Sequence, residues 1–183
     1  MKDFNDFLMD FSEDPRVEKK KEAKEQFEND MTDEQREACK KAMDYLMDLD
    51  KTEWQVRSKL LDKGFSEEDA EVALSYVRAY GYVDDYKYAV RFINIYSKKR
   101  SNRRIREDLK KRHVPEATVD LAFEEAAPDE NAALTKDLKK ILEKYDVDNL
   151  EYADKQKIMA KVYRKGYSPE NIRKVLYSLT NED

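Results

Sequence analysis

Apolar residues recur at spacings of three and four along most of the chain from residue 34 onward. This period matches one face of an α-helix. The same helix–turn–helix pattern occurs in three segments, residues 56–74, 105–123 and 158–176, whose starting points lie 49 and 53 residues apart. Repeats of that length are typical of stacked helical units. The pattern therefore predicts a chain built from tandem helical repeats.

Five apolar positions correspond between the three segments, and we expect each set to occupy an equivalent place in a small core. The distances between the positions are the same in every segment, which is why the correspondence extends through the turn. The sets are Val56, Ile105 and Ile158; Leu60, Leu109 and Val162; Phe65, Val114 and Tyr167; Ala70, Val119 and Ile172; and Leu74, Phe123 and Leu176.

The turns inside the segments carry residues that end one helix and start the next. Gly64 and Gly166 stand where a left-handed residue closes a helix. Ser66 and Ser168 follow two residues later, where a hydroxyl caps the next helix. In the middle segment His113 occupies the glycine position. We therefore predict that this turn is the least regular of the three.

Another helical pattern precedes each pair, over residues 38–49, 88–96 and 134–145. Three helices per unit and three units predict an all-α fold, an elongated array of three tandem three-helix repeats that can curve. About 50 residues bury little apolar surface alone, so neighbouring units are expected to share surface.

Four segments follow from this reading. Residues 1–33 form an acidic extension, weakly ordered or a helical arm. Residues 34–81 form the first repeat, residues 82–127 the second, which is basic, and residues 128–183 the third.

The amino-acid composition excludes several classes of function. Charged residues make up 42% of the 183 residues, against about 25% in an average domain. Cys39 is the single cysteine and His113 the single histidine, which excludes an internal disulfide and a His–His metal pair. We expect no enzyme, no cofactor and no bound metal. The first residues lack the pattern of a signal peptide and no apolar run is long enough to cross a membrane, so a cytoplasmic location is expected. We also expect a monomer.

Charge is distributed unevenly. Residues 84–113 hold 11 basic and 4 acidic side chains, a net charge of +7, and residues 114–155 have a net charge of −7. Several arginines follow Ser101, a predicted helix cap, where the positive end of the helix dipole disfavours cations. We interpret the run as a surface for an anionic partner; the alternative is a solvated face paired with residues 114–155. The candidate binding residues are Lys98, Lys99, Arg100, Arg103, Arg104, Arg106, Lys110, Lys111 and Arg112.

Aromatic residues gather just before this run. Their helical spacing favours packing within or between repeats, and stacking on nucleic-acid bases is the alternative. Trp54 is expected to be packed, with a half-exposed interface anchor as the alternative, and His113 is expected to end a helix. The tyrosines are Tyr76, Tyr80, Tyr82, Tyr86, Tyr88 and Tyr96.

Residues 79–93, AYGYVDDYKYAVRFI, resemble the core motif of the RecX family, regulatory proteins that modulate the RecA recombinase. Residues 56–65 and 104–114 resemble the family's two helix–turn motifs, and the likeness covers roughly residues 36–180. Departures occur at residues 49–52, Ser101 and His113. The motif positions that we expect to form the seam between repeats are Gly81, Tyr82, Val83, Asp84, Asp85, Tyr88, Ala89 and Phe92.

The resemblance implies a non-enzymatic protein that lies in the groove of the RecA–single-stranded DNA filament. There it would hold back the ATPase, strand exchange and filament growth, and so regulate DNA repair, recombination and the SOS response. Two alternatives remain: a helical-repeat module that binds single-stranded nucleic acid directly, and a plain helical scaffold for another protein.

Overall fold

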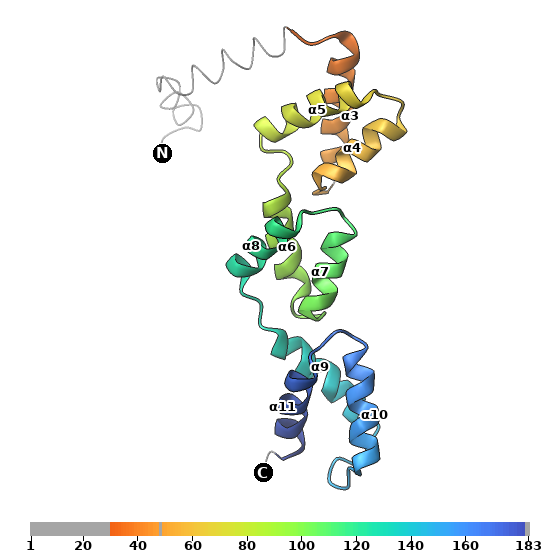
Figure 1. Cartoon of the computed structure of the whole chain (residues 1–183), viewed down its shortest axis with the longest axis vertical. Coiled ribbons are helices and arrows are strands. Elements are labelled where there is room, and N and C mark those ends of the chain that lie inside the picture. Colours follow the sequence, from red (N-terminus) through yellow and green to blue (C-terminus); the bar gives the residue numbers. More distant parts are fainter. Residues whose placement is uncertain (1–29, 48, 182–183) are drawn as a thin grey trace, which may run out of the picture. The chain divides into compact units, whose positions relative to one another are not determined.

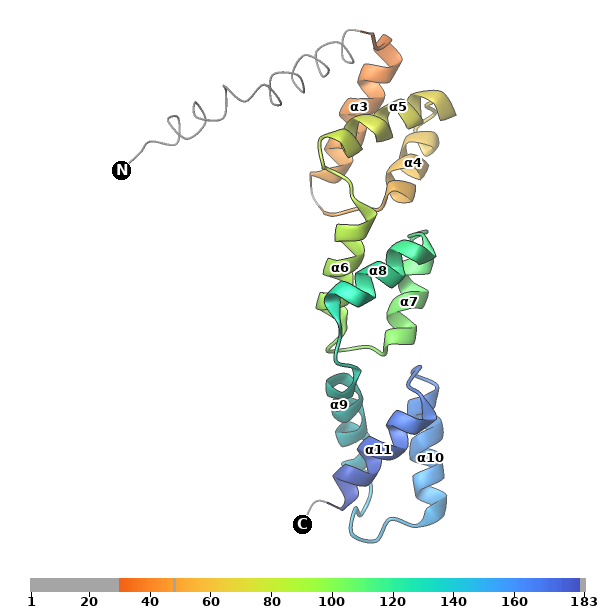
Figure 2. The ribbon, with the colours of Figure 1, turned by 60° about the vertical axis from the view of Figure 1, so that its left-hand side comes forward.

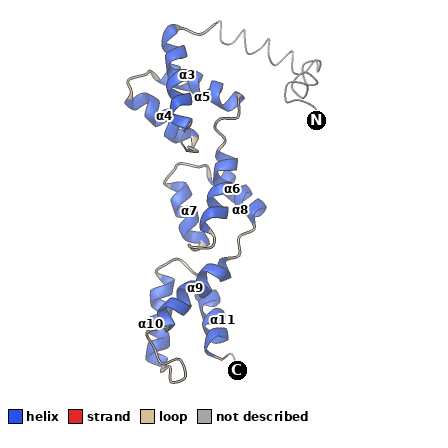
Figure 3. Cartoon of the chain, turned by 180° about the vertical axis from the view of Figure 1, so that it is seen from behind, coloured by secondary structure: helices blue, strands red, loops and turns tan. Residues whose placement is uncertain are grey.

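A computed structural model of the chain describes residues 30–47 and 49–181. Within these ranges every regular element is a helix (Figure 3). The all-α prediction is confirmed. The predicted acidic extension lies outside the described residues, except for its last four.

The contacts divide the chain into two compact units. The described residues up to 49, together with 56–82, form the first unit, and residues 50–55 group with residue 83 onward in the second. In the first unit α3 packs against α5, and Arg57 of α4 forms ion pairs with Glu67 and Glu71 of α5. The helices are α3 (Asp33–Leu46), α4 (Glu53–Asp62), whose first residues belong to the second unit, and α5 (Glu67–Ala79).

The second unit holds two groups of three helices (Figures 1 and 2). In the first group α6 packs against α7 and α8, and in the second α9, α10 and α11 pack against one another. Each group has its own apolar core. The helices are α6 (Asp85–Tyr96), α7 (Asn102–Lys110), α8 (Glu116–Ala126), α9 (Glu130–Leu142), α10 (Tyr152–Tyr163) and α11 (Pro169–Thr180).

The predicted repeat boundaries after residues 81 and 127 fall in loops between these helix groups. That each segment is a separate domain stays a prediction, because the two groups of the second unit share contacts.

Nearly all the corresponding apolar positions are buried as predicted. Phe65 and Phe123 are only half-buried. Phe123 packs against the core of its group while the guanidinium of Arg106 lies 4.2 Å from its ring centre. The ring therefore lies at the edge of the core, where a cation covers it in place of apolar side chains.

The turns follow the predicted chemistry. Gly64 and Gly166 have φ values of +92° and +103°, in the left-handed region. Ser66 and Ser168 each accept a hydrogen bond from a backbone N–H in the first turn of the next helix. His113 adopts a φ of +57°, so the middle turn keeps the left-handed conformation without glycine.

Hydrogen bonds join the two helix groups of the second unit. The hydroxyl of Ser101, the N-cap of α7, donates to the carbonyl of Lys165 at 2.7 Å. The carboxylate of Glu130 accepts from the backbone N–H of Asn102 at 2.7 Å and from the side-chain amide of Asn171 at 3.3 Å. These contacts fix the start of α7 against the α10–α11 turn.

Candidate anion-binding surface of the second unit

The nine basic residues predicted to bind a partner surround one helix. Three precede α7 in the loop that follows α6, three lie in the first half of α7, and the last residue of α7 and the two after it complete the set. Ser101 accepts a hydrogen bond from the backbone N–H of Arg104 and so caps α7 as predicted. The cap therefore marks the boundary between the basic residues of the loop before Ser101 and those of the helix after it.

Carboxylates one turn further along compensate the arginines at the start of α7. Arg103 lies 3.4 Å from Glu107, and Arg104 lies 3.2 Å from Glu107 and 3.9 Å from Asp108. Arg106 contacts Asp120 of α8 at 2.5 Å. The unfavourable position near the positive end of the helix dipole is thus balanced inside the protein, and by itself it does not require a ligand.

Asp108 is the buried anchor of this surface, with 7% of its surface exposed. Its carboxylate lies 2.5 Å from the guanidinium of Arg100, and its backbone carbonyl accepts a hydrogen bond from Arg112. The two guanidiniums also lie over the rings of Tyr96 and Phe92, at 4.4 and 4.7 Å. Aromatic faces and one buried carboxylate therefore orient both arginines. In the sequence Asp108 counts only as one of the four acidic residues among residues 84–113.

The four lysines differ from the arginines. Lys98, Lys99, Lys110 and Lys111 are exposed, and within residues 30–47 and 49–181 none of them has a carboxylate partner. Their charge is uncompensated and available to an anion.

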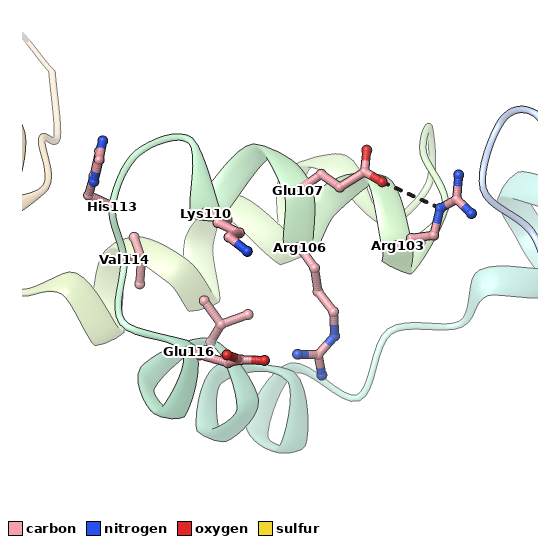
Figure 4. Close-up of a pocket in the computed structure, with 8 residues that line it drawn as sticks. Arg103, Arg106, Glu107, Lys110, His113, Val114 and Glu116 are labelled. Atoms are coloured by element: carbon pink, nitrogen blue, oxygen red, sulfur yellow. Dashed lines mark ion pairs between the residues drawn. The ribbon is translucent and has the colours of Figure 1, made fainter.

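Two hollows use different faces of α7. The first, which we call the α7–α8 hollow, has a volume of about 430 Å³. In Figure 4 the Arg103–Glu107 ion pair lies at one end of it and His113 at the other, with Val114 on the loop below His113 and Glu116 at the start of α8. It is lined by Arg103, Arg106, Glu107, Lys110, His113, Val114, Glu116 and Val119.

The second hollow, which we call the α7–α10 cleft, has a volume of about 580 Å³. Residues of the α6–α7 loop, of α7 and of the α10–α11 turn meet in it. Sequence reasoning missed Arg164 and Lys165, although they precede Gly166 as Lys111 and Arg112 precede His113. The lining residues are Lys99, Arg100, Ser101, Arg104, Asp108, Arg112, Asp137, Arg164, Lys165 and Tyr167.

The motif positions of residues 81–92 mainly cap and pack. Gly81 has a φ of +70°, and Asp84 caps α6 by accepting from the backbone N–H of Lys87, a hydrogen bond that lowers the pKa of Asp84. Asp85 accepts from the backbone N–H of Glu53.

The remaining motif side chains divide between core and surface. Val83, Ala89 and Phe92 are buried, and Tyr88 stacks on Phe92 at the edge of the core. Tyr82 is 54% exposed. The motif therefore reflects the folding of α6 and its entry loop, and the nine candidate binding residues lie after it.

Two aromatic predictions have mixed outcomes. Trp54 is 43% exposed and stacks on His113, with ring centres 3.9 Å apart, so the half-exposed alternative describes it. Tyr88 and Tyr96 flank Phe92 and pack against the core, which agrees with the packing that their helical spacing favoured. Tyr76, Tyr80 and Tyr82 form a chain of neighbouring rings.

Two negative findings apply to the part of the chain that the structure describes. There, no three His, Cys, Asp or Glu side chains come together as metal ligands. None of the helices there has both the length and the apolar character needed to cross a membrane.

Comparisons with known proteins agree with this architecture. The model of the first three-helix domain of RecX matches residues 38–76. The Regulatory protein RecX of Vibrio campbellii is 33% identical over 148 residues, which cover 78% of this chain and 89% of that protein. The Regulatory protein RecX of Vibrio vulnificus is 32% identical, covering 79% of this chain and 93% of the relative.

Solved structures show the same fold. The crystal structure of RecX from Lactobacillus salivarius matches with a TM-score of 0.71 over 81% of this chain and 98% of that one, at 17% identity. A crystal structure of regulatory protein RecX matches with a TM-score of 0.68 at 23% identity. Because curated relatives above 30% identity are covered almost along their whole length, the chain belongs to the RecX family of regulatory proteins.

Proposed function

We propose that this protein binds the RecA–single-stranded DNA filament and negatively modulates its ATPase, strand exchange and growth. Membership of a family of regulatory proteins supports a regulator of this kind. The observation that carries the proposal is the concentration of cations around α7, four of them lysines without a carboxylate partner among the described residues. A filament of nucleic acid and protein offers the phosphates and carboxylates that such a surface attracts.

The contacts we assign are electrostatic and are spread around α7, over both of its hollows. The four exposed lysines attract the filament, and the arginines, held in place by Glu107, Asp108 and Asp120, form hydrogen bonds to anionic groups. Many weak contacts to neighbouring filament subunits give a combined affinity that no single contact supplies. The surface comprises Lys98, Lys99, Arg100, Arg103, Arg104, Arg106, Lys110, Lys111 and Arg112.

In this proposal the protein is a monomer that occupies part of the filament surface, with no catalysis and no cofactor. Direct binding to single-stranded nucleic acid is the second candidate, because the lysines around α7 suit phosphates as well as carboxylates. The two candidates differ in whether recombinase is needed for tight binding.

The test is DNA-dependent ATP hydrolysis by the cognate recombinase, titrated with the full chain and with the Lys98→Glu/Lys111→Glu variant. These lysines are exposed and have no ion pairs among the described residues, so their reversal leaves the fold intact. We expect the concentration for half-inhibition to rise at least tenfold, because two attractive charges become repulsive. Lys139→Glu/Lys174→Glu, which changes the net charge equally on α9 and α11, is the matched control and should inhibit as the wild type does.

Equal inhibition by wild type and by Lys98→Glu/Lys111→Glu would remove the assigned surface. Absence of inhibition by the wild type at any concentration would remove the proposed function, and tight binding to bare oligonucleotide in that case would favour the second candidate.

A further inference from the structure

The α7–α10 cleft differs from the rest of the basic surface in its lining. Six of its residues are cations and two, Asp108 and Asp137, are carboxylates. Arg100 and Arg104 share Asp108, and Lys165 lies 2.6 Å from Asp137. The remaining cations of the lining are Lys99, Arg112 and Arg164.

These three cations have no carboxylate partner within the described residues. Arg112 bonds the carbonyl of Asp108, and Arg164 bonds the carbonyl of Ala160 at 3.3 Å through its Nε. A guanidinium has five N–H donors, so each arginine keeps donors for a ligand. The cleft thus holds a net positive charge that nothing described in the protein neutralises.

The two walls of the cleft are held at a fixed separation. Ser101 bonds the carbonyl of Lys165, and an added Cβ on Gly166 would lie 2.5 Å from the Ser101 hydroxyl, so the backbone of the α10–α11 turn lies directly against the cap of α7. Glu130 joins Asn102 to Asn171 on the same seam. A site whose walls are already placed loses little conformational entropy when a ligand binds.

The lining indicates which kind of anion fits. None of the described residues that line the cleft has an aliphatic side chain, whereas Val114 and Val119 line the α7–α8 hollow. Protein–protein interfaces depend on apolar or aromatic anchor residues at their centre, and the cleft offers such a residue no apolar surface to pack against. Tyr167, the one aromatic residue among the described residues of the lining, is 1% exposed and bonds Asp137 through its hydroxyl, so its ring is unavailable for stacking on a base.

We propose that the α7–α10 cleft binds the phosphodiester backbone of single-stranded nucleic acid. Lys99, Arg112 and Arg164 supply the charge, and Arg100 and Arg104, oriented by Asp108, supply further donors to phosphate oxygens. The cleft has the volume of a small-ligand site, into which a flexible single strand can place its backbone. The inference deepens the proposed function and rests on it, because the proposed function supplies the single strand, as part of the RecA–DNA filament.

The test is binding of the full chain to a fluorescent oligothymidylate, measured by anisotropy over a series of salt concentrations. Arg164→Gln and Lys99→Gln should each weaken binding and reduce the slope of log K against log salt by about 0.7, the value expected for one lost phosphate contact. Lys174→Gln, an exposed lysine of α11 outside the cleft, is the matched control and should leave the slope unchanged. Far-UV circular dichroism checks that each variant is folded.

Three outcomes overturn the assignment. One is an affinity and a salt slope equal to wild type in both cleft variants. Another is a duplex of the same length that binds more tightly than the single strand. The third is weaker binding of polyglutamate by Arg164→Gln with unchanged binding of oligothymidylate, which assigns the cleft to an acidic protein surface.

Recombinase ATPase assays on the same samples separate this inference from the proposed function. If the wild type binds oligothymidylate through the cleft but leaves the ATPase unchanged, the proposed function fails and the cleft stands. If the wild type inhibits the ATPase while Arg164→Gln binds the strand normally, the cleft assignment fails and the proposed function stands.

Discussion

The α7–α8 turn and the α10–α11 turn make the same backbone change with different residues. Gly166 takes the left-handed position in one and His113 in the other. Gly166 is pressed against Ser101, so a side chain has no room, whereas His113 is exposed and stacks on Trp54. The comparison teaches that a left-handed turn needs glycine most where another segment packs against it. Where the space is open, a residue with a side chain can take the left-handed position, and stacking of its ring offsets part of the backbone strain.

Gly166→Ala should have the largest effect. It places a side chain in a left-handed conformation and against the Ser101 hydroxyl, and we expect a loss of about 2 kcal/mol or more in the free energy of unfolding. Gly64→Ala is the matched control, because Gly64 has a similar φ and open space around its Cβ, so only the backbone strain remains. Urea denaturation followed by circular dichroism measures both. Equal losses in the two variants would show that the contact with Ser101 adds nothing.

Ser101→Ala should have the next largest effect. Ser101 caps α7 and also donates to Lys165 from a buried position, so its removal should cost about 1–2 kcal/mol. Ser168→Ala removes an exposed cap that has no second described partner, and about 1 kcal/mol or less is expected. The same denaturation experiment ranks the two, and a larger loss for Ser168→Ala would contradict the double role of Ser101.

Tyr167→Phe tests the residue after the glycine, where the other turn has Val114. The lost bond to Asp137 should cost about 1 kcal/mol at neutral pH. Burial and the charge of Asp137 raise the pKa of Tyr167, so above pH 10 the unfolded chain loses its phenol proton first. This part of the stability is complete below pH 10 and falls as pH rises further.

The pH experiment compares unfolding free energies of wild type and Tyr167→Phe between pH 9 and 11.5. The wild type should lose stability more steeply above pH 10, because the other tyrosines are common to both proteins. Parallel curves would mean that the Tyr167 phenol ionises as readily in the folded protein as in the unfolded one.

His113→Gly should have the smallest effect. Relief of left-handed strain, about 1 kcal/mol, opposes the loss of the stack on Trp54, worth about 0.5–1.5 kcal/mol, so the net change should lie within about 0.5 kcal/mol. In a Trp54→Ala background only the relief remains, and the same substitution should stabilise. Loss of stability in that background would show that His113 contributes through contacts other than the stack.

The repeat pattern predicted much of the local structure. Corresponding residues such as Ile105 and Ile158 are each buried in the core of their own helix group, and Ser66, Ser101 and Ser168 cap helices as their positions indicated. Such features depend on neighbours within a few residues, so the order of residue types carries the information. The basic run before and along α7 was equally visible, because charge is a property of composition.

The charge pairing was not visible. The sequence placed nine cations on one surface, whereas the structure divides most of them between two hollows and pairs the arginines of α7 with Glu107, Asp108 and Asp120. The lysines have no carboxylate partner among the described residues. A list of charges does not contain the distances on which pairing depends. The stack of Trp54 on His113 was missed for the same reason, since the two residues lie 59 positions apart.

By itself, then, the sequence determined the helices, their caps, the repeating core positions and the family to which the chain belongs. Only the tertiary structure decided that Arg164 and Lys165 join Lys99 and Arg112 around one cleft, with Ser101 holding its walls together. The reason is physical: helical period and capping are short-range and recur along the chain. A binding site instead depends on the packing of distant segments, which brings their charges within reach of a single ligand.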